Sequence, residues 1–245
     1  MQTAERSYAS LANSDMDRES YGLSVMMILV IDVGGTHIKL KRQGSDEVRK
    51  CPSGMELTPQ RMIEQVRSAA EGWAFDHVSI GYPGVVIDGA IQREPVNLAV
   101  GWVGFDFASA LGCPVKILND AAMQALGSYE GGRMLFLGLG TGLGTALMYN
   151  DFLLSMELGH LPYKKGLSYE DYVGQAGMKR LGRRKWKSAV FDLVARLRAA
   201  FLPEYVVLGG GNVKKMDELP PGCRMGDNRN AFLGGFRMWD ASAKK

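Results

Sequence analysis

The chain has 245 residues, of which 46% are hydrophobic, 22% charged and 9% aromatic. This composition is typical of a globular protein with a sizeable core, and it excludes collagen-like, coiled-coil and disordered chains. The net charge is only +3, yet residues 1–160 carry 12 Lys and Arg against 18 acids, whereas residues 161–245 carry 17 against 8. Such an asymmetry can concentrate an anionic ligand on one side of the molecule, or it can mark a solvated basic helix face.

The cysteines, the longest apolar run and the first residues of the chain indicate the compartment in which the protein is expected. Cys51, Cys113 and Cys223 are scattered and form no C-x-x-C pair, which argues against a disulfide framework or a cysteine-built zinc site. The longest apolar run, residues 25–33, is too short to cross a membrane. Residues 1–25 are interpreted as a disordered lead or an upstream start rather than a secretory signal. We therefore expect a cytoplasmic protein without membrane contact.

The first motif is a hairpin around a glycine turn. An apolar run, residues 27–33, ends in Gly34-Gly35-Thr36 and is followed by residues 37–41, which alternate like a half-exposed strand. Asp32 lies at the mouth of this turn, where backbone N–H groups can approach an anion and the carboxylate can hold magnesium. The alternative is a plain hairpin whose Asp and Thr satisfy their own backbone.

The next segment predicts a helix and two buried strands. Thr58-Pro59 is a cap and first-turn pair for an amphipathic helix that ends by Gly72. Residues 78–82 and 115–118 are apolar strand candidates. Asn119-Asp120 follows the second strand and opens a helical pattern, so Asp120 is either an N-cap or a general base at a strand end.

The hairpin pattern recurs about a hundred residues later. Residues 134–139 enter Gly140-Thr141-Gly142, and residues 143–149 and 152–154 follow as strands. This turn matches neither the dinucleotide-binding fingerprint nor the Walker loop. Alternating strands and helices, occurring twice, predict two α/β domains with a cleft between them, the first over residues 26–117 and the second over residues 118–245. The last helix is expected to pack on the first domain.

Polar residues in the second half offer further site candidates. Glu157 and His160, at i and i+3, share one face of a helical turn and can bind neighbouring hydroxyls. Glu170 by itself is typical of a helix first-turn acid. Gly209-Gly210-Gly211 follows the strand at residues 205–208 and is either a ligand platform or a mobile loop. A basic cluster, residues 179–187, contains six Lys and Arg and no acid, which suits a polyanion or a solvated helix face.

Six motifs, in this order and spacing, resemble the ROK sugar kinases, and among these the polyphosphate-using glucokinases. The resemblance runs from about Met27 to the C-terminus. Its motifs are residues 31–36, 81–86, Asn97-Leu98 with Trp102, 119–121, 139–144 and 157–161.

The resemblance implies two ribonuclease-H-like domains of the actin and hexokinase superfamily, and it implies a role for each motif. Asp120 is expected to be the base for the sugar 6-hydroxyl, and Asp32 to orient Mg2+. The expected sugar-binding residues are Gly84, Asn97, Asn119, Glu157, His160 and Glu170. The phosphoryl donor is expected at Gly34, Gly35, Thr36, Lys39, Gly140, Thr141 and Gly142, with adenosine at Gly209, Gly210 and Gly211.

The resemblance leaves several alternatives open. The donor is ATP or polyphosphate, and the short segment after Glu170 together with the basic cluster favours polyphosphate. Residues 161–167 lack the cysteines of the family's zinc motif, so zinc is not expected. By analogy we expect a homodimer. The rivals are a kinase for another hexose, a sugar-binding protein without turnover and, less favoured, a nucleic-acid binder.

Overall fold

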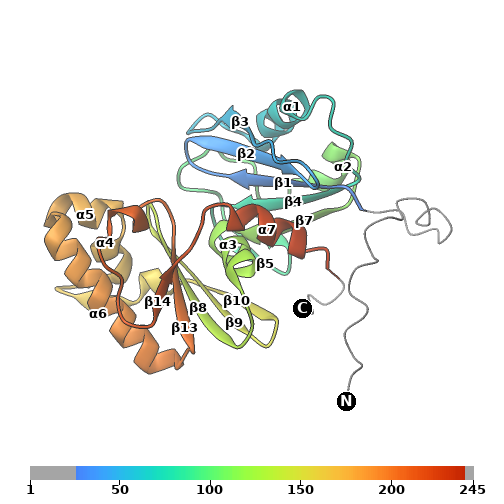
Figure 1. Cartoon of the computed structure of the whole chain (residues 1–245). Helices are drawn as coiled ribbons and strands as arrows, with labels where there is room; N and C mark the ends of the chain where they lie inside the picture. Colours follow the sequence, from blue (N-terminus) through green and yellow to red (C-terminus); the bar gives the residue numbers. More distant parts are fainter. Residues whose placement is uncertain (1–25, 241–245) are drawn as a thin grey trace, which may run out of the picture.

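A computed structural model describes residues 26–240 of the chain. Its architecture is two mixed five-stranded sheets, each with helices packed against it (Figure 1). The predicted lead, residues 1–25, lies outside the described residues. Within residues 26–240, none of the helices combines the length and the apolar character that a membrane span requires.

The first sheet is built from the first predicted hairpin. Its strand order is β3-β2-β1-β4-β7, with the first three strands antiparallel and the last two parallel to β1. The strands are β1 (Ile28–Val33), β2 (His37–Arg42), β3 (Arg49–Pro52), β4 (His77–Tyr82) and β7 (Val115–Asn119). Helices α1 (Pro59–Ala69) and α2 (Phe107–Leu111) and a small hairpin of β5 (Val86–Ile87) and β6 (Ala90–Ile91) complete this half.

The second sheet repeats the same topology. Its order is β10-β9-β8-β13-β14, again three antiparallel strands followed by two parallel ones. The strands are β8 (Arg133–Leu139), β9 (Leu143–Tyr149), β10 (Phe152–Met156), β13 (Tyr205–Gly209) and β14 (Cys223–Met225). The internal duplication that the hairpins predicted is therefore present in the fold.

Helices and short elements cover the second sheet. They are η1 (Leu158–His160), β11 (Pro162–Lys164), β12 (Leu167–Ser168), α4 (Tyr169–Val173), α5 (Gln175–Leu181), α6 (Arg183–Phe201) and η2 (Val213–Lys215). The apolar side of α6, with Trp186, Val190 and Leu193 fully buried, packs against the core side of the sheet. The sequence predicts an amphipathic helix over residues 186–202, with Val190, Leu193, Val194 and Leu197 as its apolar stripe. The stripe is confirmed, and the helix begins three residues earlier than predicted.

Helix α1 follows its local signals. The Thr58 hydroxyl accepts a hydrogen bond from the Arg61 amide, and Pro59 occupies the first turn, where its missing N–H costs nothing. Met62, Ile63 and Val66 are buried in the core of the first sheet. The predicted cap and apolar stripe are confirmed.

Helix α3 (Asp120–Ser128) lies between the two sheets. Its alanines, including Ala121 and Ala125, pack with Phe136 and Met148 of the second sheet. Its Met123 packs instead with Val30 of the first sheet. Because α3 contacts both halves, a residue at its start is placed between them.

The last helix, α7 (Asn230–Arg237), returns to the first sheet and crosses α3 closely. A methyl group on Gly127 of α3 would lie 1.8 Å from the Asn230 carbonyl oxygen, and one on Gly234 would lie 1.8 Å from that of Met123. Only glycine permits this approach. On the other side of α7, the buried Ser79 hydroxyl donates to the Gly235 carbonyl.

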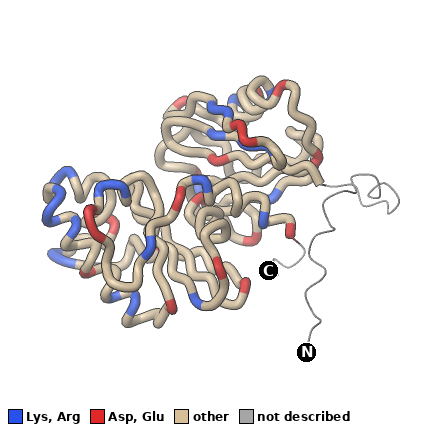
Figure 2. Tube along the Cα trace, viewed as in Figure 1, with Lys and Arg blue, Asp and Glu red and all other residues tan. Residues whose placement is uncertain are grey.

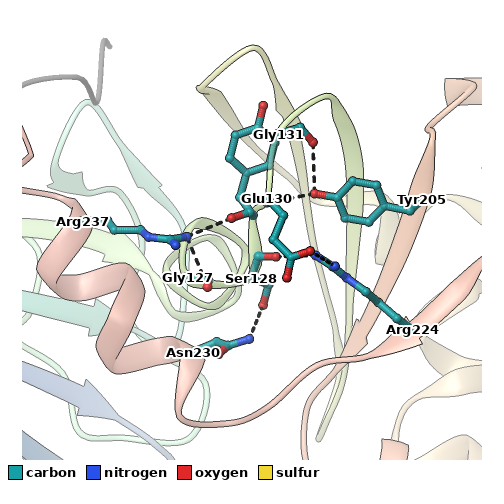
Figure 3. Close-up of polar contacts among 9 residues, drawn as sticks. Gly127, Ser128, Glu130, Gly131, Tyr205, Arg224, Asn230 and Arg237 are labelled. Carbon is teal, nitrogen blue, oxygen red and sulfur yellow. Dashed lines mark hydrogen bonds and ion pairs between the residues drawn. The ribbon is translucent and has the colours of Figure 1, made fainter. Parts of the chain in front are cut away.

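The C-terminal end of α3 is held by side chains from distant parts of the chain (Figure 3). Arg237 donates to the carbonyl oxygens of Leu126, Gly127 and Tyr129, which otherwise have no partner at a helix end. Arg224 donates to the Ser128 carbonyl, and the Tyr205 hydroxyl accepts from the Glu130 amide and donates to the Gly131 carbonyl. Helix α3 is thus fixed from β13, β14 and α7.

Candidate functional site

The first glycine turn, between β1 and β2, carries charged side chains. Asp32 and Lys39 stand opposite each other in the strand register, and Lys39 Nζ donates to Asp32 Oδ2 over 3.0 Å. Asp32 is 7% exposed, so its carboxylate is a buried charge with one cationic partner. Gly35 and Thr36 are exposed at the tip, and the Gly34 amide donates back to the His37 carbonyl.

The second glycine turn, between β8 and β9, is uncharged and supported from outside. Its Gly140 amide donates to the Gly142 carbonyl, and the Thr141 carbonyl accepts from the amide of Gln175 at the start of α5. Asn212 Nδ2 donates to the Gly140 carbonyl over 2.7 Å. Thr141 is exposed at the tip, so this turn also presents backbone to solvent.

Glu170 supports the second turn from α4. Its Oε2 accepts the Leu143 amide over 2.9 Å, and a methyl group on Gly142 would lie 2.2 Å from that oxygen. Glu170 occupies the first turn of its helix, as predicted. The same side chain is therefore both a predicted sugar contact and a neighbour of the predicted phosphate turn.

Asn119 and Asp120 lie where β7 ends and α3 begins. The N-cap is Asn119, whose Oδ1 accepts the Ala121 and Ala122 amides, so the alternative interpretation of Asp120 as the N-cap residue is wrong. Asn and Asp are equally good caps, which is why the sequence did not separate them. Asn119 Nδ2 also donates to the Gly84 carbonyl over 3.0 Å. Two predicted sugar-binding residues thus meet directly beside Asp120.

The electrostatic surroundings of Asp120 favour its neutral form. Burial, followed by the neighbouring negative charge of Asp32, raises the pKa of Asp120 to about 7, and Glu157 adds to the effect. The hydrogen bond from the Ala121 amide acts in the opposite direction and is outweighed. A carboxyl group with a pKa close to neutral is well suited to accept a proton from a hydroxyl and release it again.

Glu157 and His160 come together at η1. His160 Nε2 lies 3.5 Å from Glu157 Oε2, so the two side chains share one face, as predicted. The segment is anchored by the buried Thr145 hydroxyl, which donates to the Met156 carbonyl and accepts from the Leu158 amide. Partial desolvation is the largest cause that raises the pKa of Glu157.

Asn97 lies beside the first glycine turn. A methyl group on Gly35 would lie 3.7 Å from the Asn97 Cβ. Asn97 is exposed, while its neighbour Leu98 and the motif residue Trp102 are buried in the core of the first sheet. The predicted sugar and phosphate residues of the first domain therefore adjoin each other.

Packing accounts for much of the Gly209–Gly211 segment. A methyl group on Gly209 would lie 2.5 Å from the Phe136 ring, and Gly210, at φ +81°, is packed against the Leu139 backbone. Gly211 alone of the three faces open space. The segment meets the second turn through Asn212, but two of its glycines are required by the fold itself.

The basic cluster lies on α5 and the start of α6, at the far left in Figure 2. Arg183 and Lys187 both pair with Asp217, and Arg180 donates to the Asp171 carbonyl. No hydrogen bond or ion pair joins Lys179, Arg184 or Lys185 to another residue within 26–240. Half of the cluster is thus available to an anion and half stabilises the fold.

Several supporting residues were not predicted from the sequence. Thr145 holds the Glu157 segment, Asn212 holds the second turn, and Lys215 Nζ donates to Asn212 Oδ1 over 3.0 Å. Asn212 follows three glycines at a strand end, and this position was the only available signal for it. In the described part of the chain no three or more His, Cys, Asp or Glu side chains gather as a metal would need.

This arrangement defines the class of fold. No family model matches the chain. The solved structure of an inorganic polyphosphate/ATP-glucomannokinase from Arthrobacter sp. strain KM superposes with a TM-score of 0.73 and 24% identity, covering 86% of this chain and 97% of that one. A ROK family glucokinase from Streptomyces griseus, in complex with glucose and AMPPNP, gives a TM-score of 0.68 and 17% identity, covering 86% and 98%. The predicted fold, α/β domains of the ROK and hexokinase type, is confirmed.

Comparison of sequences also finds sugar kinases among the relatives of this chain. The chain is 27% identical over 213 residues to the polyphosphate glucokinase of Mycobacterium tuberculosis, covering 78% of this chain and 80% of that protein. The resemblance to ROK sugar kinases, and among them to polyphosphate glucokinase, is therefore confirmed.

Proposed function

We propose that the protein is a glucokinase-type phosphotransferase that moves a phosphoryl group to the 6-hydroxyl of glucose. The names of its relatives support this activity, and one observation carries it. Asp120, with a pKa raised to about 7, stands at the start of α3 between the two sheets. It adjoins the buried Asp32 of the first glycine turn and the hydroxyl-binding candidates Asn119 and Glu157.

The chemistry is an in-line displacement. Asp120 accepts the proton of the sugar 6-hydroxyl, the hydroxyl oxygen forms a bond to the terminal phosphorus of the donor, and the bond from that phosphorus to its bridging oxygen breaks. The shortened donor leaves with the electron pair. Positioning and charge neutralisation supply most of the acceleration in such reactions. The backbone N–H groups of the two turns and the Lys39 ammonium provide those charges.

The residues present suit Mg2+. Asp32 offers one nearly buried carboxylate beside an exposed glycine turn, and Mg2+ in such sites is held by one or two carboxylates together with the phosphates of the substrate. When bound, the ion would neutralise phosphate charge. Asp32 would orient it, and Lys39 would keep Asp32 in place.

The sugar is proposed to lie among Gly84, Asn97, Asn119, Glu157, His160 and Glu170. Two observations support this proposal: Asn119, the neighbour of Asp120, contacts Gly84, and Glu157, whose charge acts on Asp120, lies close to His160. A site that binds several hydroxyl groups rejects analogues that lack one, because its own polar groups would then be unpaired.

The donor is proposed to be polyphosphate, with ATP as the alternative. Lys179, Arg184 and Lys185 are the available cations of the basic cluster on α5 and α6, and α5 begins at the second turn. A chain of phosphates that leaves that turn along α5 would meet these charges. Replacing Arg184 and Lys185 by Ala should reduce polyphosphate use and leave ATP use unchanged. The matched control, replacement of the fold-pairing Arg183 and Lys187, should lower stability instead.

The test is glucose 6-phosphate formation with magnesium, glucose and either ATP or long-chain polyphosphate. We expect product from polyphosphate, loss of at least about 100-fold in kcat in Asp120→Asn, and kcat/KM that rises with pH through about 7 as Asp120 loses its proton. Product from ATP alone would overturn the donor assignment. Full activity in Asp120→Asn would overturn the mechanism.

The alternatives have their own outcomes. Turnover of mannose, fructose or an N-acetyl hexosamine in place of glucose would make the protein a kinase for that sugar. Sugar binding without turnover would make it a regulatory protein of the same fold. A homodimer, proposed by analogy with the relatives, is tested by the molar mass in solution.

A further inference from the structure

The loop between β6 and α2 closes on itself through one side chain. Glu94 Oε2 accepts the amides of Gly101 and Trp102, each over 3.0 Å, and Oε1 accepts the amide of Val103 over 3.3 Å. One carboxylate thus holds three consecutive N–H groups. Such convergence requires an unusual backbone, which Gly101 supplies at φ +102°.

The charge of Glu94 is part of this closure. Desolvation raises the pKa of Glu94, but the amides of Trp102, Val103 and Gly101 together lower it below its ordinary value. Hydrogen bonds from N–H groups to a charged carboxylate are about twice as strong as neutral ones. The loop is therefore closed by an ionised group that remains exposed to solvent.

Two hydrogen bonds and two buried side chains fix the closed loop to the first sheet and its helices. The buried Tyr82 hydroxyl donates to the carbonyl of Arg93, the residue before Glu94, over 2.9 Å. Inside the loop, Leu98 is 3% exposed and the Ala99 amide donates to the Leu57 carbonyl. Beyond Gly101, Trp102 is fully buried near Tyr82. Between Arg93 and the buried Leu98, Pro95 is buried, whereas Val96 and Asn97 form a short exposed segment.

Asn97 belongs to that exposed segment. Its side chain makes no hydrogen bond to any residue of 26–240, and it lies beside Gly35 of the first turn. Its backbone position is set by Glu94 on one side and by Leu98 on the other. An exposed amide held at a fixed place is well suited to recognise a hydroxyl group.

We propose that Glu94 is a positioning residue for sugar specificity, which presents Asn97 to the hexose by clamping the loop of residues 94–103. The inference rests on the proposed function, since it takes Asn97 as a sugar contact. Glu94 itself touches no substrate. Its contribution is the reduced freedom of the loop before the sugar arrives, which lowers the entropy cost of binding.

The test is the Glu94→Gln variant, which keeps the size of the side chain and removes its charge. We expect the KM for glucose to rise about tenfold, with kcat and the KM for the phosphoryl donor changed by less than about twofold, because ground-state and transition-state binding weaken together. A merely structural role would lower stability without this selective rise in the sugar KM.

Asp76→Asn is the matched control. The Asp76 carboxylate also accepts a backbone amide, that of Met27. Its pKa is also lowered, first by its hydrogen bond with His77. Asp76 lies at the start of β1, whereas the first glycine turn lies at the end of that strand. We expect this variant to lose stability with no change in the sugar KM. An equal rise in both variants would overturn the proposal.

A double-mutant cycle shows whether Glu94 acts through Asn97. In the Asn97→Ala background, Glu94→Gln should add less than about twofold to the sugar KM, because the group that it positions is already absent. Additive effects would overturn the proposed route. If the wild-type protein phosphorylates sugar but Glu94→Gln leaves the KM unchanged, only this inference fails. If the wild-type protein phosphorylates no hexose, the proposed function fails with it.

Discussion

The two glycine turns occupy equivalent places in duplicated sheets, yet they are built differently. The first turn carries its own charges, Asp32 and Lys39, paired across neighbouring strands. The second turn carries none and is held by Glu170 and Asn212, which come from outside its hairpin. The same hairpin backbone thus carries charged side chains in one half, whereas in the other half it is held by side chains from outside the hairpin.

This difference separates two kinds of effect. Changes in the first turn should act on the charge at the proposed reacting groups, whereas changes in the second should act on the geometry of the proposed donor site. Because the first turn supplies a carboxylate whose charge acts on Asp120, together with the cation that pairs with that carboxylate, its substitutions should have the larger effects on turnover.

The largest expected effect is that of Asp32→Asn. Removing this carboxylate removes the proposed magnesium ligand and the partner of Lys39, so kcat/KM should fall about 100-fold or more. Steady-state kinetics measure it. The exposed Asp46, on the turn after β2, serves as the control, and its change to Asn should leave the kinetics unaltered. A loss of kcat/KM below tenfold would show that the charge of the first turn contributes little to turnover.

Lys39→Met should have the next largest effect. It keeps the aliphatic stem but leaves the buried Asp32 carboxylate without its cation, which should raise the donor KM about tenfold and lower the free energy of unfolding by about 1 kcal/mol. Chemical denaturation and kinetics report the two effects. Lys41→Met, two residues along the same strand, is the comparison, and equal behaviour of the two variants would refute the ion-pair role.

In the second turn, Gly142→Ala and Gly140→Ala should differ. A methyl group at Gly142 meets the Glu170 carboxylate at 2.2 Å, whereas one at Gly140 meets nothing within 4 Å. The Gly142 variant should lower the melting temperature by roughly 2–4 °C and raise the donor KM. Gly140→Ala should leave the melting temperature unchanged, so equal melting temperatures would show that the Glu170 contact does not set the turn.

Asn212→Ala should have the smallest effect. It removes the donor to the Gly140 carbonyl and the partner of Lys215, at a cost of about 1 kcal/mol. We expect a rise of about two- to fivefold in the donor KM and none in the sugar KM, measured with each substrate varied in turn. The exposed Asn228, changed to Ala, is the control; an unchanged donor KM in Asn212→Ala would remove Asn212 from the site.

Much of the fold was predictable because its signals are local. The hairpins follow from alternation around glycine turns, α1 from its Thr-Pro start, and α6 from its apolar stripe. The repeated topology then followed from the recurrence of one pattern. These features depend on neighbours in the sequence, which is why they were visible there.

The supports of the site depend on distant parts of the chain. Asn212 reaches Gly140 across 72 positions, and Glu170 reaches Leu143 across 27. The Glu94 clamp spans fewer residues, but it needs the left-handed Gly101 to bring three amides together. The motifs identified the candidate residues, whereas the side chains that support them could be identified only from the three-dimensional structure. The functional roles themselves remain predictions.

The position of helix α7 affects how the first sheet can fold during translation. Phe232 of α7 and Met238 directly after it pack against Ile28 and Val30 at the start of β1, and a methyl group on Gly235 would lie 2.3 Å from Val30. The first sheet therefore takes part of its core from a segment that is translated after the strands of both sheets. Domains usually fold as they emerge from the ribosome, but here one side of β1 lacks part of its cover until the second sheet has also been translated. We therefore expect a chain that ends before residue 230 to expose this side of β1 and to aggregate more readily than the longer chain.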